Sequence, residues 1–282
     1  MTTYDHNTAQ TEFIDAEGTR FAYRRFGEPG STPLVLLQHF MGNLDNYDPM
    51  ITDALAMGRE VILTDNAGVG LSTGKAPETV AGMGRDAASL IDALRLEKVD
   101  LFGFSMGGFV AQQIALDRPE LVRRLALVGT GPRGGDGMDQ LAPDVVPLFT
   151  TPLEPQDLMW LPIFFSPSDV SQRSGRAFLE RIRSRTEDRD TPVSDTTVAA
   201  HLAAAREWGA PAPDSFEYLK GIHHPTLVVN GSDDVVVPTI NSYILQQNLP
   251  NAELILFPDS NHGSHFQFTE AFNRYVTDFL DR

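Results

Sequence analysis

The chain has 282 residues, of which 41% are hydrophobic and 21% are charged, and this composition is typical of a globular protein with one large core. Its formal net charge of −16 argues against nucleic acid as a partner, because nucleic acid attracts basic surfaces, and mildly disfavours polyanionic substrates. The absence of cysteine excludes disulfides, a thiol nucleophile and thiolate metal sites.

Neither a leader peptide nor a membrane span is expected from the sequence. The first residues, MTTYDHNTAQTEF, are polar and lack the basic and apolar regions of a signal peptide. No uninterrupted apolar segment is long enough to cross a bilayer. We therefore expect a soluble, cytoplasmic protein with no membrane partner.

Strand-like runs alternate with helical patterns along most of the chain. The runs that predict strands are TEFIDAEG, RFAYRRFGEPG, PLVLLQH, REVILTDN, VDLFGF, LVRRLALVGT, PTLVVN and AELILF. Helical spacing appears in GRDAASLIDALRLEK, in the stretch from Met106 to Asp117, and in the closing FNRYVTDFL. Continuous apolar runs such as PLVLLQH are typical of strands buried on both faces. The alternation predicts an α/β fold, a mostly parallel sheet flanked by helices.

The alternation stops between Thr130 and His223. This stretch opens with GPRGGDG, is rich in aromatic residues and proline, and continues with the helical pattern GRAFLERIRSR. It contains no strong candidate for a buried strand. We predict a helical cap over residues 131–222, inserted between two parts of one sheet domain, residues 1–130 and 223–282.

The sequence Gly-Phe-Ser-Met-Gly, residues 103–107, lies where a predicted strand becomes a helix. A serine at such a sharp turn is held in a strained conformation that presents its oxygen above the sheet. The strand and helix approach closely there, which requires glycine at positions 103 and 107. The helix N-terminus favours developing negative charge. Ser105 is therefore the candidate nucleophile, and the Met106 N–H is the first candidate donor to an oxyanion.

A nucleophilic serine needs a base and an acid that orients the base. His262, on the loop after AELILF, is the preferred base, and its rival is His265, which we expect to begin the final helix. Asp234, after the strand LVVN, is the preferred acid, with Asp233 as the alternative. A third carboxylate at a strand end, Asp65, is expected to form a structural Asx-type turn with its Gly-rich loop. The scattered histidines predict no metal site.

The second oxyanion donor is expected from the loop His39-Phe40-Met41-Gly42-Asn43, which follows the strand PLVLLQH. A backbone N–H is what matters here, so the side chain need not be polar. Phe40 is the preferred donor and Met41 the alternative.

These motifs together resemble the α/β-hydrolase superfamily over nearly the whole chain. The resemblance rests on LLQHFMG, TDNAGVGLS, GFSMGG, NGSDDVVVP and DSNHGS. It implies an eight-stranded sheet with a helical cap, Ser105 as nucleophile, His262 as base and Asp234 as acid. Small bacterial esterases and cofactor-free haloperoxidases or perhydrolases are the most similar members. Epoxide hydrolases and haloalkane dehalogenases differ, because they carry Asp at the nucleophile position. Phe40 departs from the superfamily, in which Gly is common at this position.

The resemblance and the motifs favour a serine hydrolase that cleaves carboxylic esters without a cofactor. Trp160 and Phe164 of the cap are candidate substrate-binding residues for a small or medium, mostly hydrophobic ester, although their cluster with Met159, Leu161 and Phe165 is equally compatible with a cap core. Lactonase, thioesterase and perhydrolase or haloperoxidase activities share the acyl-enzyme step. A ligand receptor built on the same fold is the alternative class. Neither the physiological substrate nor the oligomeric state follows from the sequence.

Overall fold

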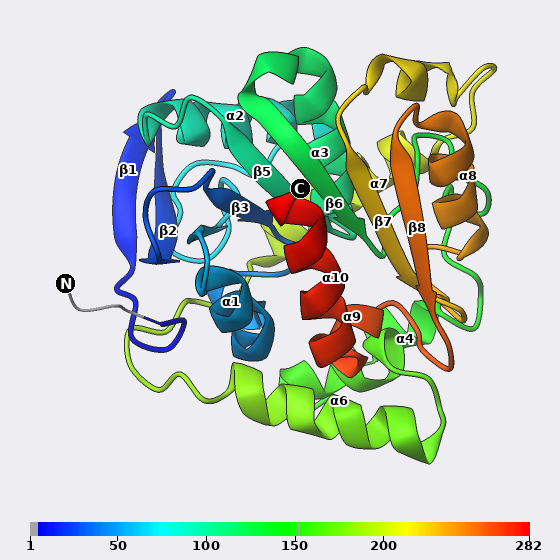
Figure 1. Ribbon diagram of the computed structural model, residues 1–282. Coiled ribbons are helices and arrows are strands. Elements are labelled where there is room, and N and C mark those ends of the chain that lie inside the picture. The colour runs from blue at the N-terminus through cyan, green and yellow to red at the C-terminus, as the bar shows by residue number, and fades with distance from the viewer. Residues whose placement is uncertain (1–4, 152) are drawn as a thin grey trace.

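The computed structural model describes residues 5–151 and 153–282, arranged around one central sheet (Figure 1). The strand order is β1-β2-β4-β3-β5-β6-β7-β8. The β1/β2 and β2/β4 pairs are antiparallel, and the five other pairs are parallel. The mostly parallel, eight-stranded sheet is therefore confirmed. The strands are β1 (Glu12–Ala16), β2 (Thr19–Gly27), β3 (Leu34–Leu37), β4 (Glu60–Thr64), β5 (Val99–Phe104), β6 (Val122–Val128), β7 (Thr226–Gly231) and β8 (Ala252–Phe257).

Helices cover both faces of the sheet because its central strands are apolar on both sides. In β3, Leu34 and Leu36 pack into the cluster that contains α1 and α10, whereas Val35 and Leu37 pack into the cluster that contains α2, α3 and α8. The helices that flank the sheet on its two faces are α1 (Pro49–Ala56), α2 (Val80–Ala93), α3 (Met106–Asp117), α8 (Ile240–Asn248), α9 (Ser264–Gln267) and α10 (Thr269–Asp281). The sequence patterns did not predict α1 and α8.

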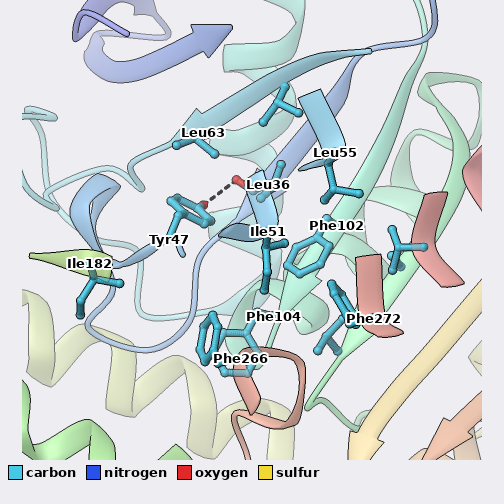
Figure 2. Close-up of a cluster of buried hydrophobic side chains, with 14 of the residues drawn as sticks. Leu36, Tyr47, Ile51, Leu55, Leu63, Phe102, Phe104, Ile182, Phe266 and Phe272 are labelled. Carbon is cyan, nitrogen blue, oxygen red and sulfur yellow. Dashed lines mark hydrogen bonds between the residues drawn. The ribbon is translucent and has the colours of Figure 1, made fainter. Parts of the chain in front are cut away.

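Part of the core on the α1 and α10 side is shown in Figure 2. Leu36 and Phe102 from the sheet face Ile51 of α1 and Phe272 of α10. The Tyr47 hydroxyl, buried at the edge of this cluster, donates a hydrogen bond of 2.7 Å to the Leu36 carbonyl oxygen. This bond satisfies a polar group that would otherwise be costly to bury.

The described residues between β6 and β7 contain helices and no strand. The helices are α4 (Val146–Thr150), α5 (Trp160–Phe164), α6 (Asp169–Ile182) and α7 (Asp195–Gly209). Ile182 of α6 joins the core cluster of Figure 2, so the inserted stretch packs directly on the sheet domain. The division into segments 1–130, 131–222 and 223–282 stays a prediction. Over the described ranges, no helix combines the length and apolarity needed to cross a membrane.

Most of the predicted elements match the structure closely, and several helices differ at their boundaries. β5 and α3 have the predicted limits. The helix expected from Gly84 begins earlier, at Val80, because the Thr79 hydroxyl accepts a hydrogen bond of 3.1 Å from the Gly82 N–H and caps the first turn. His265 does not begin the final helix, because Phe268 interrupts the helical path between α9 and α10 with φ −114° and ψ 41°.

Candidate active site

Ser105 lies at the turn between β5 and α3, in a conformation that L-residues rarely adopt. Its φ is 55° and its ψ −118°, and such strain persists only when the surroundings hold it in place. The Ser105 N–H donates to the Val128 carbonyl oxygen at 2.9 Å, and the Thr130 hydroxyl donates to the Ser105 carbonyl oxygen at 2.8 Å. Contacts from β6 and from the loop after it therefore hold the turn on both sides.

The two glycines that flank the serine stand where no larger residue fits. A Cβ on Gly103 would overlap the backbone of Gly107, and a Cβ on Gly107 would overlap the carbonyl group of Leu37. Strand β5, helix α3 and the end of β3 therefore touch through their backbones. This contact places Ser105 at the carboxyl end of the parallel strands, where ligands bind in such sheets.

The structure brings Ser105, His262 and Asp234 into one hydrogen-bonded chain. His262 Nε2 lies 2.8 Å from Ser105 Oγ, and His262 Nδ1 lies 2.8 Å from Asp234 Oδ2. A carboxylate can only accept, so Nδ1 carries the proton, and the unprotonated Nε2 accepts from the serine hydroxyl. All three side chains are buried. The arrangement has the geometry of a nucleophile, a base and an orienting acid.

Asp234 is held by its own turn, whereas the adjacent Asp233 points away. Asp234 Oδ1 accepts hydrogen bonds of 2.9 Å from the N–H groups of Val236 and Val237, which leaves Oδ2 for the histidine. Asp233 is exposed, and its carboxylate accepts a hydrogen bond from the neighbouring Ser232 hydroxyl. Of the two candidate acids, Asp234 is therefore the one that reaches His262.

Asn261, which sequence reasoning missed, links the acid turn to the histidine loop. Its Oδ1 accepts from the N–H groups of Val235 and His262, both at 2.9 Å. Its Nδ2 donates to the Pro162 carbonyl oxygen of α5 at 3.3 Å. Asn261 precedes the histidine directly, but an asparagine beside a histidine carries no recognisable sequence signal.

The rival base lies in a different environment. His265 is buried among the rings of Phe102, Phe104, Phe266 and Phe272. It makes no hydrogen bond with Ser105 or Asp234, and burial lowers the pKa of its imidazole well below the ordinary value. The geometry leaves His262 as the histidine that can serve Ser105.

Asp65 has a structural contact, although it is not the expected Asx-type turn. Its Oδ1 accepts a hydrogen bond of 2.9 Å from the Leu44 N–H, on the segment that follows β3. Asp190, from the stretch between α6 and α7, accepts from the same N–H at 3.2 Å. The expectation of an Asx turn was wrong because Oδ1 accepts from a distant backbone donor rather than from the following Gly-rich loop, and Oδ2 is buried without a partner among the described groups.

Three residues whose backbone N–H groups are candidate donors line the cavity in front of Ser105. They are Phe40, Met41 and Met106. The Met106 N–H opens helix α3 and has no partner within the helix. The Phe40 N–H makes no hydrogen bond with any described group, whereas the Met41 N–H donates to Nδ1 of His201 at 3.4 Å. The alternative donor is therefore already engaged.

The cavity in front of Ser105 has a volume of about 530 Å³ and mostly apolar walls. Trp160 and Phe164 line it, and their rings stack with centroids 4.9 Å apart. The other members of the predicted cluster do not line the cavity: Met159 and Phe165 are buried in the hydrophobic core, and Leu161 packs against it. The predicted cluster therefore divides between the cavity wall and the core. The two charged residues among the lining side chains, Asp139 and Arg206, are both exposed. Sequence reasoning missed the walls contributed by residues 137–141, α4 and α7, because they lie far apart in the chain.

Within residues 5–151 and 153–282, no three His, Asp or Glu side chains are grouped in a way that could hold a metal ion. The expectation that the protein needs no metal or cofactor stays a prediction.

Comparison with known proteins gives consistent results over almost the whole chain. Residues 32–269 match the family model described as the alpha/beta hydrolase fold. A poly(3-hydroxyalkanoate) depolymerase of Ectopseudomonas oleovorans is 30% identical, with 93% of this chain and 88% of that protein covered. A 2-hydroxy-6-oxo-6-phenylhexa-2,4-dienoate hydrolase of Burkholderia cepacia is 28% identical, with 98% and 97% covered.

A solved structure of an alpha/beta hydrolase fold protein from Chitinophaga pinensis is more similar still. It is 43% identical, covers 99% of both chains and superposes with a TM-score of 0.92. The sheet order, the family match and these relatives agree with the resemblance seen in the motifs. The chain belongs to the α/β-hydrolase fold family, whose related proteins include hydrolases.

Proposed function

We propose that the protein is a serine hydrolase that cleaves carboxylic esters through an acyl-enzyme intermediate. The observation that carries the proposal is the hydrogen-bonded chain from Asp234 through His262 to Ser105, which ends in an apolar cavity. Such a chain activates a serine hydroxyl that is otherwise a weak nucleophile.

The proposed reaction follows from the roles that the geometry allows. Ser105 Oγ attacks the ester carbonyl carbon while His262 Nε2 takes the hydroxyl proton. The N–H groups of Phe40 and Met106 donate to the oxygen that becomes negative, and each such donor contributes on the order of 3 kcal/mol to lowering the barrier. His262 then protonates the leaving alcohol, and Asp234 stabilises the charged imidazole in between.

The second half of the reaction releases the acid. Water loses a proton to His262 and attacks the acyl carbon, and the proton then returns to Ser105 as the acyl–oxygen bond breaks. The proposed reaction uses side chains and backbone N–H groups of the protein together with water, so the proposal needs no metal or cofactor.

The walls of the cavity define the proposed substrate class. A cavity of about 530 Å³ lies within the size range of small-molecule sites. Its apolar lining favours a small or medium, mostly hydrophobic ester, with Trp160 and Phe164 as binding residues. The depolymerase relative supports an ester, because its name denotes cleavage of a polymer of hydroxy acids, and such acids polymerise through ester bonds.

Turnover of p-nitrophenyl esters of increasing chain length tests the proposal. We expect steady release of p-nitrophenol by the wild type, and we expect Ser105→Ala to fold normally while losing on the order of 10⁶ in kcat. A fluorophosphonate probe should label Ser105 in the wild type and leave the variant unlabelled. Substantial turnover by Ser105→Ala, or labelling at another residue, would overturn the nucleophile. A single burst without turnover would instead favour the ligand receptor.

A further inference from the structure

The cavity in front of Ser105 has two apolar walls that differ in their exposure to solvent. On one wall, Trp160, Ile163 and Phe164 of α5 are buried in the hydrophobic core. The other wall comes from two helices of the insertion, α4 and α7, and none of its side chains is buried: they are Val146, Phe149, Val198, Leu202 and Ala205. This second wall is apolar surface that the protein itself leaves partly uncovered.

Two side chains of the second wall lie where the cavity meets solvent. Val146 of α4 is 41% exposed and Leu202 of α7 is 36% exposed. Among the large hydrophobic side chains that are exposed in the described part of the chain, these two are the ones that line the cavity. The same cavity is also lined by four exposed polar residues, Asp139, Gln140, Thr150 and Arg206. An exposed apolar patch bordered by polar residues is typical of a ligand-binding groove. We call Val146 and Leu202 the apolar mouth.

Helix α7 carries its part of the wall without needing it for packing. Val198, Leu202 and Ala205 are four and three residues apart, so they lie on one side of the helix. The helix is anchored elsewhere, because the buried Trp208 stacks on Phe109 of α3 with ring centroids 5.4 Å apart. The exposure of Leu202 is therefore not required to hold α7 in place, and its side chain is available to a ligand.

We propose that the apolar mouth binds an extended alkyl chain of the substrate, which runs from the carbonyl group at Ser105 along α7 and past Val146 and Leu202 toward solvent. The inference rests on the proposed ester hydrolysis and deepens it, because it names the substrate class as esters with a long alkyl chain. A substrate chain is favoured as the occupant because Ser105 and the mouth line one continuous cavity. A chain bound there would remove the uncovered apolar surface from water.

The expected signature is a rise in kcat/KM with chain length. Each methylene group that leaves water contributes up to about four-fold in kcat/KM, until the chain has passed the mouth. A polar side chain at the mouth should reduce this rise, because the chain would then meet a group that stays hydrated. The ratio of kcat/KM for a long ester to that for a short ester measures the effect.

Two series of esters, all used below their critical micelle concentrations, test the proposal. The p-nitrophenyl esters from acetate to decanoate lengthen the acyl chain, and the butyrates from methyl to decyl lengthen the alcohol chain. In at least one series, kcat/KM of the wild type should rise with length. Leu202→Gln keeps a side chain of similar length and makes it polar, so the long-to-short ratio in that series should fall by about 10-fold. The series that responds tells whether the mouth binds the acyl or the alcohol part.

Val146→Thr and Val170→Thr form a matched pair, because they are the same substitution at two exposed valines of the insertion. Val146 lines the cavity, whereas Val170 of α6 is 58% exposed and does not line it. Val146→Thr should lower the long-to-short ratio by a few-fold, and Val170→Thr should keep the ratio of the wild type. Thermal melts check that each variant folds, as expected for exposed positions.

Several outcomes would overturn the proposal. They are a wild-type kcat/KM that does not rise with length in either series, a ratio that is unchanged in both Leu202→Gln and Val146→Thr, and an equal decrease in Val170→Thr. A rise that begins only above the critical micelle concentration would also overturn it, and would indicate a lipid surface as the occupant.

Failure of the proposed function looks different, because the wild type would then turn over neither short nor long esters. Calorimetric titration with 1-decanol and 1-butanol tests the mouth without turnover. Tighter binding of 1-decanol by the wild type, weakened in Leu202→Gln, would support the mouth even in that case. Equal binding of the two alcohols, or equal binding of 1-decanol by the wild type and Leu202→Gln, would overturn it.

Discussion

The serine turn and the loop that carries Phe40 border the same cavity but are held in different ways. The turn is held by backbone contacts among neighbouring elements: Gly103 against Gly107, and Gly107 against the end of β3. The loop His39–Asn43 is held partly by contacts with a distant part of the chain, among them the hydrogen bond from the Met41 N–H to His201 in α7. The Asn43 side chain of the loop also donates a hydrogen bond of 3.0 Å to the carbonyl oxygen of Thr191, which lies in the stretch that precedes α7.

This difference assigns separate tasks to the two regions of the protein. The sheet domain alone contains the proposed triad, because Ser105, Asp234 and His262 all follow strands of the sheet. The loop His39–Asn43, in contrast, also has contacts with the helical insertion. Substitutions that weaken the packing of the insertion should therefore lower kcat before they disturb the triad, and three predictions probe the two sides of this comparison.

The largest of these effects is expected for Asp234, the acid of the proposed triad, which belongs to the sheet domain. Asp234→Asn should keep the fold but allow the wrong histidine tautomer, and its kcat should fall by up to about 10⁴. Asp233→Asn is the matched control, because Asp233 is the exposed neighbour in the same turn. It should behave as an ordinary surface substitution. Measuring kcat for both variants on one ester, with thermal melts, tests the prediction. If Asp233→Asn lost most of its kcat while Asp234→Asn kept a kcat near the wild type, Asp233 rather than Asp234 would be the acid.

The next effect concerns the stability of the serine turn. Gly107→Ala would place a Cβ against the Leu37 carbonyl group, and overpacking of this kind costs about 1–3 kcal/mol or more. We expect a lower free energy of unfolding together with reduced activity. Gly58→Ala is the control, because a Cβ at Gly58 meets nothing within 4 Å. Urea denaturation of both variants measures the difference, and equal stabilities would show that backbone contact does not hold the turn.

The last effect depends on pH and concerns Asp65, which accepts a hydrogen bond from the Leu44 N–H directly after the loop. Burial, together with the Asp190 carboxylate, raises the pKa of Asp65 well above its ordinary value, so folding favours the neutral acid. The stability that this gives is complete below the unfolded pKa of about 4 and is lost as pH rises through the folded pKa, at about 1.4 kcal/mol per pH unit. Asp65→Asn stays neutral, and its amide can still accept from Leu44 and can donate to Asp190.

Melting temperatures measured from pH 4 to pH 8 test this prediction. Asp65→Asn should melt close to the wild type at pH 4 and progressively above it as pH rises. Asp15→Asn, an exposed change of the same charge, should show no such trend. A constant difference between Asp65→Asn and the wild type across this range would mean that the Asp65 carboxyl group does not hold a proton in the folded protein.

Much of this architecture could be predicted because its signals are short-range. The apolar run VDLFGF predicted β5 to the residue, and the glycines around Ser105 predicted a turn that only glycine permits. Helix α8 escaped prediction because few of its residues face the core, Leu245 among them. The Asx turn expected at Asp65 failed for a similar reason, since its hydrogen-bond donor lies 21 residues upstream.

Hydrophobic periodicity and glycine spacing are properties of neighbouring residues. The sequence by itself therefore determined the order of strands and helices, the serine turn, and the carboxylate and histidine loops that follow the last strands. Only the tertiary structure decided between Asp234 and Asp233 and between His262 and His265, because each choice depends on which side chain the backbone aims at Ser105. The engagement of Met41 with His201 is the clearest such case. Two residues 160 positions apart meet only after α7 packs against helices α2 and α3, and no local pattern in either segment encodes that contact.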